Sequence, residues 1–168
     1  MRKILRLSIV LIVKNGATKR GDGKWVRTRI GEVRIRIDEK TKCLLGISFE
    51  GPVDPGAAEK EGGLEASLRG YRLPEARTDF AAEVLRAVAA IPPGRTISYG
   101  ELAKRVGRPG AARAVGRVMA QNAFAPVIPC HRVVPASGEC GNYRWGADRK
   151  AALLRLEQET GRDAWRIL

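Results

Sequence analysis

The spacing of the apolar residues changes about halfway along this chain of 168 residues. Between residues 26 and 37, branched side chains alternate with arginine, which is the period of a half-buried antiparallel strand. After residue 77 the apolar residues recur three and four positions apart, as on an amphipathic helix. The chain is therefore predicted to be α+β, with a small antiparallel β domain and its linker over residues 1–76 and a helical domain over residues 77–168.

Turn signals divide the first part into short elements. Strands are predicted at residues 4–13, over 26–37 and at 43–49, with a short helix near 63–68 and a linker over 71–77. Nothing in this part suggests chemistry, and Cys43 is expected to be a small core residue.

Capping signals divide the second part into helices. Thr78 is placed to cap one helix, and Ser98 with Glu101 forms a capping box ahead of a second, short helix. A third helix is predicted over residues 111–120, after a turn that contains glycine, so that the two short helices form a helix-turn-helix. A final helix is predicted over residues 148–160.

The net charge of +13 indicates a polyanionic partner, either nucleic acid or an anionic membrane surface. The apolar run at residues 4–13 is too short to span a bilayer and no cleavage site follows it, which favours nucleic acid and a cytoplasmic location. Seven basic residues and one acid lie between Arg95 and Arg132. The helix at 111–120 lacks side chains that read base edges, so its small residues suit a minor-groove or shape contact. The basic residues are mostly arginine, which suits phosphate contacts and is also compatible with a thermophilic source.

The only histidine, His131, directly follows Cys130 within an apolar run. A thiol becomes an effective nucleophile as its thiolate, and an imidazole is the usual helper, so this pair is a candidate catalytic site. A buried structural cysteine beside a histidine is the alternative interpretation. The chain has three cysteines, Cys43, Cys130 and Cys140, and an odd number does not suit a framework of disulfides, which predicts a reducing compartment. None of them has Cys-x-x-Cys spacing, which predicts that there is no zinc site.

Glu157 lies beside a stripe of leucines in the last predicted helix, namely Leu153, Leu154 and Leu156. A carboxylate at the solvated edge of such a stripe is the ordinary interpretation. If Glu157 is buried it needs a partner, and His131 is the expected one.

Five segments around the Cys-His pair carry a family resemblance. They are Ile97-Ser98-Tyr99, Ala111-Ala112-Arg113-Ala114-Val115-Gly116, Asn122, Pro129-Cys130-His131-Arg132-Val133 and Gly141-Asn142-Tyr143. In this order and spacing they resemble the O6-alkylguanine-DNA alkyltransferases, also called methylated-DNA–protein-cysteine methyltransferases. The resemblance covers about residues 78–161 and is only architectural before that. It implies a ribonuclease H-like N-terminal domain followed by a winged helix-turn-helix domain.

The resemblance also implies an activity, namely single-use repair in which an alkylated guanine is flipped out of double-stranded DNA and its alkyl group moves to Cys130. His131 would act as base for the thiol through a water molecule, Glu157 would orient and charge His131, and Asn122 would brace the turn. Tyr143 would face the O6 atom as a donor. No metal or cofactor is implied, and the protein is expected to be a monomer.

For the DNA itself, the resemblance implies that Arg113 enters the base stack and that Tyr99 turns the phosphate and serves the guanine N3 atom. The carbonyls of Cys130 and Val133 would accept from the guanine amino group, and the backbone of Arg144 would face O6. The other residues expected to contact DNA are Ala112, Ala114, Gly116 and Arg117.

The chain departs from the family pattern at two places. Ala123 follows Asn122 where proline is common, and the bulky Arg144-Trp145 follows Tyr143, which is expected to disfavour large O6 substituents. Cys140 is expected to be incidental.

Three other functions compete with alkyl transfer. A lesion-sensing protein without transfer activity would lack the acceptor cysteine, and a winged helix-turn-helix regulator would need base-reading side chains. A cysteine hydrolase would normally have catalytic partners that are distant in sequence.

Overall fold

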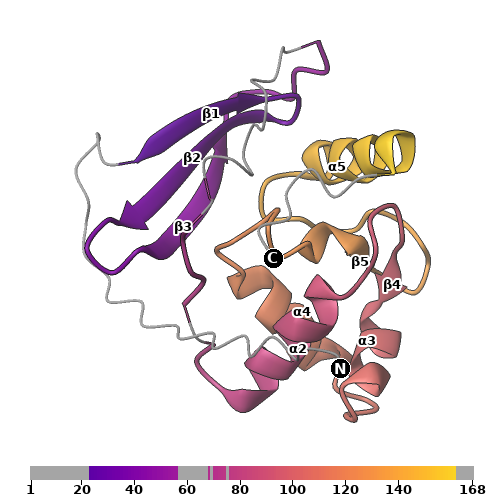
Figure 1. Ribbon diagram of the computed structural model, residues 1–168. Helices are drawn as coiled ribbons and strands as arrows, with labels where there is room; N and C mark the ends of the chain where they lie inside the picture. Colours follow the sequence, from indigo (N-terminus) through magenta and orange to yellow (C-terminus); the bar gives the residue numbers. More distant parts are fainter. Residues whose placement is uncertain (1–22, 57–67, 69, 75, 162–168) are drawn as a thin grey trace, which may run out of the picture.

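The computed structural model describes residues 23–56, 68, 70–74 and 76–161. The predicted strand at 4–13 and most of the predicted helix at 63–68 lie outside these residues. Within them, three antiparallel strands are followed by a helical part, so the predicted α+β class is confirmed (Figure 1). The boundary after residue 76 stays a prediction.

The sheet has the strand order β1-β2-β3, with β1 at Lys24–Thr28, β2 at Gly31–Asp38 and β3 at Cys43–Glu50. Val33 pairs with Val26 on one side and with Phe49 on the other, so branched and aromatic side chains gather on one face. That face is buried, with Val33 and Ile35 both 0% exposed, which confirms the alternation predicted from the sequence.

The predicted linker at 71–77 is partly ordered along this sheet. The N–H of Leu44 donates to the carbonyl of Arg72 over 2.8 Å, and the N–H of Arg72 donates to the carbonyl of Lys42 over 2.8 Å. Cys43, at the start of β3, is half-buried rather than a core residue, because it lies at this edge of the sheet.

Helices α2 (Asp79–Ala89), α3 (Tyr99–Arg105), α4 (Ala112–Gln121) and α5 (Ala147–Thr160) make up the helical part. Both capping predictions are confirmed. The N–H of Ala81 donates to Thr78 Oγ1 over 3.1 Å, and Ser98 and Glu101 exchange two bonds of 3.1 Å in a capping box. Helices α3 and α4, joined by a tight turn, form the predicted helix-turn-helix.

Two elements were not predicted. Strand β4 (Ile97–Ser98) pairs in parallel with β5 (Val133–Val134), and the short 3₁₀ helix η1 (Cys130–Arg132) directly precedes β5. Because the pairing joins the start of α3 to the end of η1, it holds the Cys-His segment against the helix-turn-helix.

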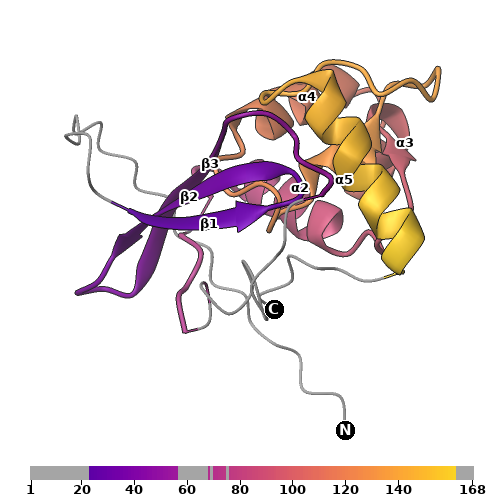
Figure 2. The same ribbon diagram turned by 90° about the horizontal axis from the view of Figure 1, so that it is seen from above.

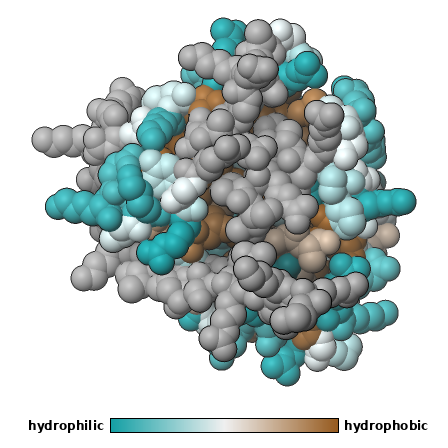
Figure 3. Space-filling view, in the orientation of Figure 1, coloured by the Kyte–Doolittle hydropathy of each residue, from teal (hydrophilic) through white to brown (hydrophobic). Residues whose placement is uncertain are grey.

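Helix α5 buries a different stripe from the predicted one. Its buried residues are Arg149, Lys150, Leu153 and Glu157, whereas Leu154 and Leu156 are only partly buried. The long polar side chains therefore face the interior, where α5 lies beside the sheet and above η1 (Figures 1 and 2). On the face drawn in Figure 3, hydrophilic side chains line the margins and apolar ones show between them. Among the described residues, no helix is long and apolar enough to cross a membrane.

Candidate active site

Cys130 lies in η1 at the wall of a cavity of about 420 Å³. Its side chain is nearly enclosed, with 5% of the residue exposed. The cavity lies between the helix-turn-helix and the segment that leads into α5, and it is lined by Tyr99, Gly116, Met119, Ala120, Cys130, Asn142, Tyr143, Arg144 and Lys150. Elements from three separate stretches of sequence therefore meet at one sulfur atom.

The structure brings several of the predicted site residues to this cavity. Tyr99, Tyr143 and Arg144 line it with Cys130. Gly116 also lines it, and a Cβ atom on this glycine would lie 3.9 Å from the Tyr99 ring, an ordinary van der Waals distance, so α4 packs beside that ring without crowding.

The predicted DNA-contacting residues occupy the outer part of α4. Arg113 and Arg117 are exposed, and Ala112 and Ala114 are half-buried. Two exposed arginines and a stripe of small residues on one helix suit close contact with a groove of DNA.

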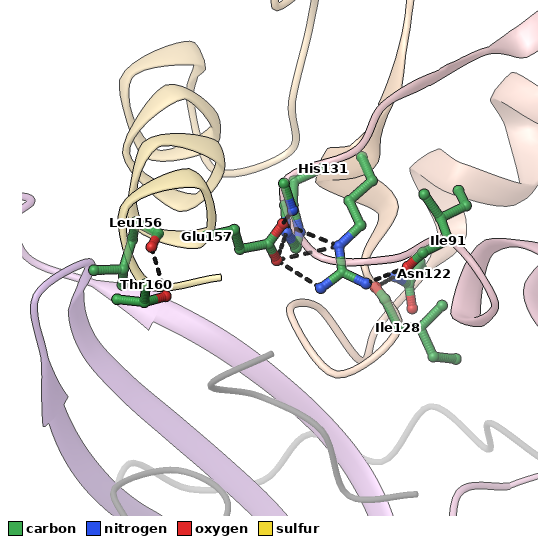
Figure 4. Close-up of polar contacts among 9 residues, drawn as sticks. Ile91, Asn122, Ile128, His131, Leu156, Glu157 and Thr160 are labelled. Carbon is green, nitrogen blue, oxygen red and sulfur yellow. Dashed lines mark hydrogen bonds and ion pairs between the residues drawn. The ribbon is translucent and has the colours of Figure 1, made fainter. Parts of the chain in front are cut away.

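Asn122 ends α4 and braces the following loop. Its side-chain amide donates to the carbonyl of Ile128 over 2.9 Å, and its side-chain oxygen accepts from the N–H of Phe124 over 3.0 Å (Figure 4). The N–H of Ile128 donates to the carbonyl of Phe124 over 2.9 Å. The loop is thus closed by three bonds although no proline follows Asn122, and it delivers Cys130 directly into η1.

Glu157 is the centre of a buried polar cluster behind Cys130, and it reaches from α5 toward His131 (Figure 4). His131 Nε2 lies 2.7 Å from Glu157 Oε1. Arg132 donates from Nε to both carboxylate oxygens, over 3.1 and 3.0 Å, and from Nη2 to Oε1 over 2.7 Å. The N–H of Gly94 donates to Oε2 over 3.0 Å. The solvated-edge interpretation of Glu157 is therefore wrong, because this residue is only 1% exposed.

Arg132 is the partner that the sequence analysis missed. It is 0% exposed, and its Nη1 donates to the carbonyl of Ile91 over 2.6 Å. Arginine next to the Cys-His pair was a usable signal, because a buried carboxylate is most readily compensated by a guanidinium. The expectation that His131 is the partner of Glu157 is thus correct but incomplete.

These contacts fix the charge of Glu157. Burial alone would raise the pKa of its carboxyl group, but hydrogen bonds from His131 and Arg132 outweigh burial and lower the pKa to about 2. The carboxylate is ionised at neutral pH and accepts only, so His131 Nε2 carries the proton that joins the two side chains.

For the pKa of Cys130, burial outweighs the stabilising contacts. Burial raises the pKa of its thiol, and this effect exceeds the lowering by Asn122, by Tyr143 and by the positive charge of Lys150. The thiol is therefore held protonated in the unliganded protein, with three groups in place to stabilise the thiolate once it forms.

Lys150 is the second residue that the sequence analysis missed. It is 1% exposed, lines the cavity, and donates from Nζ to the carbonyl of Val133 over 2.8 Å. The carbonyl of Val133, which is predicted to accept from the guanine amino group, thus already accepts a hydrogen bond from Lys150. Its second lone pair leaves room for another donor. Burial lowers the pKa of Lys150, whereas Cys140 and Cys130 raise it. The spacing of Lys150, Leu153 and Glu157 on one helical face was the available signal.

Tyr143 directs a buried hydroxyl toward Cys130. Burial raises the pKa of Tyr143 well above its ordinary value, and the nearby Cys130 raises it further. Cys130 is the group that interacts with this hydroxyl, and no other residue that the structure describes forms a hydrogen bond with it. It is therefore a donor available to a group that enters the cavity. The described part of the chain contains no group of histidine, cysteine and acidic residues that could hold a metal ion.

Known proteins resemble this chain in both sequence and fold. The family model for the DNA-binding domain of 6-O-methylguanine DNA methyltransferase matches residues 79–159. The methylated-DNA–protein-cysteine methyltransferase of Mycobacterium tuberculosis strain H37Rv is 46% identical over 116 residues, which span 66% of this chain and 66% of that protein. The bifunctional transcriptional activator/DNA repair enzyme Ada of Escherichia coli K12 is 50% identical over 82 residues, 49% of this chain and 23% of that protein.

The solved structures give the wider match. The crystal structure of Mycobacterium tuberculosis OGT in complex with DNA has a TM-score of 0.64 and 31% identity, covering 80% of this chain and 91% of that one. The O6-methylguanine-DNA methyltransferase from the hyperthermophilic archaeon Pyrococcus kodakaraensis has a TM-score of 0.59 and 25% identity, covering 81% and 98%. These relatives do not support the expected thermophilic source. They do confirm the predicted family: the chain belongs to the methylated-DNA–protein-cysteine methyltransferases.

Proposed function

We propose that this protein repairs O6-alkylguanine in double-stranded DNA by moving the alkyl group to Cys130 Sγ, once per molecule. The observation that carries the proposal is the position of Cys130 in the wall of a cavity formed jointly by α3, α4 and the Tyr143 segment. A nucleophile in this place is reachable by a base only if that base leaves the duplex, so extrusion of the guanine belongs to the reaction.

The transfer is a displacement at the alkyl carbon. The Sγ–C bond forms while the C–O6 bond breaks, and the electron pair of the broken bond goes to the guanine O6. The developing charge on the leaving guanine needs a donor, and the Tyr143 hydroxyl is a buried donor beside the sulfur. The product is a thioether, which water does not cleave at a useful rate, so each molecule reacts once.

The thiol proton must leave before or during this step, because only the thiolate is an adequate nucleophile. With Nε2 of His131 carrying a proton to Glu157, Nδ1 is the basic nitrogen of a neutral imidazole. Arg132 already balances the charge of Glu157, so His131 does not need to be charged in the resting protein. His131 is proposed as the base, Glu157 as its orienting group, and Lys150 as the cation that favours the thiolate.

Binding to DNA is assigned to α4 and the residues beside it. Exposed Arg113 is proposed to occupy the position of the departing guanine and exposed Arg117 to contact the DNA, and Ala112 and Ala114 would permit close approach. Tyr99 is proposed to contact the flipped nucleotide at the mouth of the cavity. A monomeric state and a cytoplasmic location remain predictions.

The test is the intact mass of the protein after incubation with a duplex that contains one O6-methylguanine. We expect a gain of one methylene group, a plateau at one group per molecule, and the modified peptide to contain Cys130. The rival function, lesion sensing without transfer, predicts tight binding of the same duplex with no change in mass. Modification of Cys140, or repeated turnover, would contradict the proposal.

A further inference from the structure

The segment that carries Tyr143 into the cavity has no helix or strand of its own. It lies between Gly141 and Gly146, whose φ angles of +60° and +92° belong to the region that favours glycine. The N–H of Gly146 donates to the carbonyl of Tyr143 over 3.0 Å and closes a turn. One turn between two glycines does not fix a side chain, so the position of the Tyr143 hydroxyl depends on what packs against the segment.

That packing comes from Trp145 and, through it, from the N-terminal sheet. The Trp145 ring lies 5.4 Å from the Tyr143 ring in a tilted arrangement. Its other neighbour is Phe49 on β3, whose ring is 5.2 Å away with an interplanar angle of 78°. Edge-to-face contact of this kind is a favourable geometry for aromatic pairs. Phe49 is only 7% exposed, so the sheet end of this chain of rings is held in the core.

Arg149, in the first turn of α5, ties the same parts together. Its guanidinium donates to the carbonyls of Ile30 over 2.8 Å, Gly51 over 2.5 Å and Trp145 over 3.1 Å. It also lies over the Phe49 ring, 5.2 Å from the centroid. Two strand ends of the sheet and the Tyr143 segment thus share one buried side chain.

A second contact joins β3 to the other side of the site. The N–H of Ile47 donates to the carbonyl of Ala123 over 2.7 Å, one residue beyond Asn122. Strand β3 therefore touches both the loop that delivers Cys130 and the segment that delivers Tyr143. In Figures 1 and 2 the sheet lies alongside α5, which agrees with these contacts.

We propose that the N-terminal sheet is a working part of the alkyl-transfer site, with Phe49 acting through Trp145 as a positioning residue that holds the Tyr143 hydroxyl beside Cys130. This inference rests on the proposed function, in which Cys130 accepts the alkyl group and Tyr143 donates to the leaving guanine. It predicts that a residue in the sheet, remote from the DNA-contacting helix, controls the rate of the chemical step more than the affinity for DNA.

The experiment is single-turnover transfer from an O6-methylguanine duplex, with excess protein at several concentrations, which separates the limiting rate from the half-saturating concentration. Phe49→Leu keeps an apolar side chain in the core but removes the ring that meets Trp145. We expect its limiting rate to fall by about tenfold, since small misplacements of catalytic groups cost rate steeply. We expect its half-saturating concentration to stay within about twofold of the parent value, because the DNA contacts lie on α4.

Leu44→Ala is the matched control. Leu44 is also buried in β3, at 1% exposure, but it lies five residues from Phe49, roughly 16 Å along an extended strand. The Leu44→Ala variant weakens the same sheet without removing a ring. Its limiting rate of transfer is expected to equal that of the parent protein. The second control is a double-mutant cycle with Tyr143→Phe, in whose background Phe49→Leu should have little further effect on the limiting rate.

Equal slowing by Phe49→Leu and Leu44→Ala would overturn the positioning role, because a general loss of sheet stability would then explain both. An undiminished effect of Phe49→Leu in the Tyr143→Phe background would overturn it as well. Failure of the proposed function would give a different result, because the parent protein without any substitution would then transfer no methyl group.

Discussion

Arg132 and Glu157 form a fully buried ion pair behind the nucleophile, with Arg132 Nη2 2.7 Å from Glu157 Oε1 and both side chains no more than 1% exposed. The same carboxylate oxygen accepts from His131. The pair neutralises Glu157, so His131 faces a balanced cluster and not a bare negative charge. This arrangement lets Glu157 fix the orientation and the tautomer of His131 without forcing the imidazole to become positive.

Because of the ion pair, removing the charge of Glu157 is expected to affect the stability of the fold. Glu157→Gln leaves Arg132 buried without a counter-charge, so we expect it to lower the free energy of unfolding by about 3–5 kcal/mol. The double variant Arg132→Met with Glu157→Gln removes both charges and should recover most of that loss. Urea denaturation of the parent and both variants measures this. If Glu157→Gln unfolds at the parent's midpoint, the ion pair does not stabilise the fold.

The ion pair also predicts acid sensitivity. The pKa of Glu157 is about 2 in the folded protein and 4.5 in its ordinary range. Because the folded pKa is the lower one, the stabilisation is complete above about pH 4.5 and is lost as the pH falls toward 2, by about 3 kcal/mol. Unfolding free energies of the parent should therefore fall across this range, and those of the Arg132→Met, Glu157→Gln double variant should fall less. Parallel curves for the two proteins would contradict the assignment.

Cys130→Ser should abolish alkyl transfer, with a loss of at least about 10³-fold, because a buried hydroxyl is a far weaker nucleophile than a thiolate. Affinity for the duplex should survive, since the proposed phosphate contacts lie on α4. Mass spectrometry measures transfer, and fluorescence anisotropy with a labelled duplex measures binding. Residual labelling of the serine variant would move the acceptor elsewhere, first to Cys140.

Arg113→Ala should slow repair of duplex DNA by about 10- to 100-fold, because stabilising an extruded base is worth a few kcal/mol. Reaction with free O6-benzylguanine requires no extrusion and should change little. Arg155, exposed on α5, supplies the control variant Arg155→Ala, which removes the same charge away from the helix-turn-helix. Equal losses on duplex and free base would exclude the role of Arg113 in extrusion.

Lys150→Met should raise the pKa of the Cys130 thiol further, because it removes a positive charge that lowers this pKa and keeps the apolar stem. Near neutral pH the transfer rate should fall by about tenfold for each pKa unit gained, and the deficit should shrink as the pH rises. Lys150→Arg keeps the charge and should retain more of the rate. A pH–rate profile with a free-base substrate measures both variants; a deficit that is constant with pH would indicate loss of the Val133 contact instead.

Much of the local structure was determined by the sequence alone. Alternation of branched residues with arginine predicted the strand structure of β1 and β2, though not the turn that separates them, and Ser98 with Glu101 predicted the start of α3. The Cys-His pair could also be picked out as a candidate site, because a single histidine beside a cysteine is a local pattern with a chemical meaning, and its role as nucleophile stays a proposal. These predictions share a basis: each depends on residues within a few positions of one another, where backbone geometry sets which side chains meet.

Only the tertiary structure decided how the charges are arranged around that nucleophile. Glu157 was interpreted as a carboxylate at a solvated edge, and the sequence analysis did not single out Lys150 or Arg149, yet all three are buried because α5 lies over η1 and the sheet. Arg132 and Glu157 are 25 residues apart, and Phe49 reaches the site only because β3 packs beside Trp145. Charged side chains normally remain in water, so a pattern in one helix predicts their exposure; burial becomes favourable only when distant elements supply the opposite charge or the carbonyl oxygens that replace solvent.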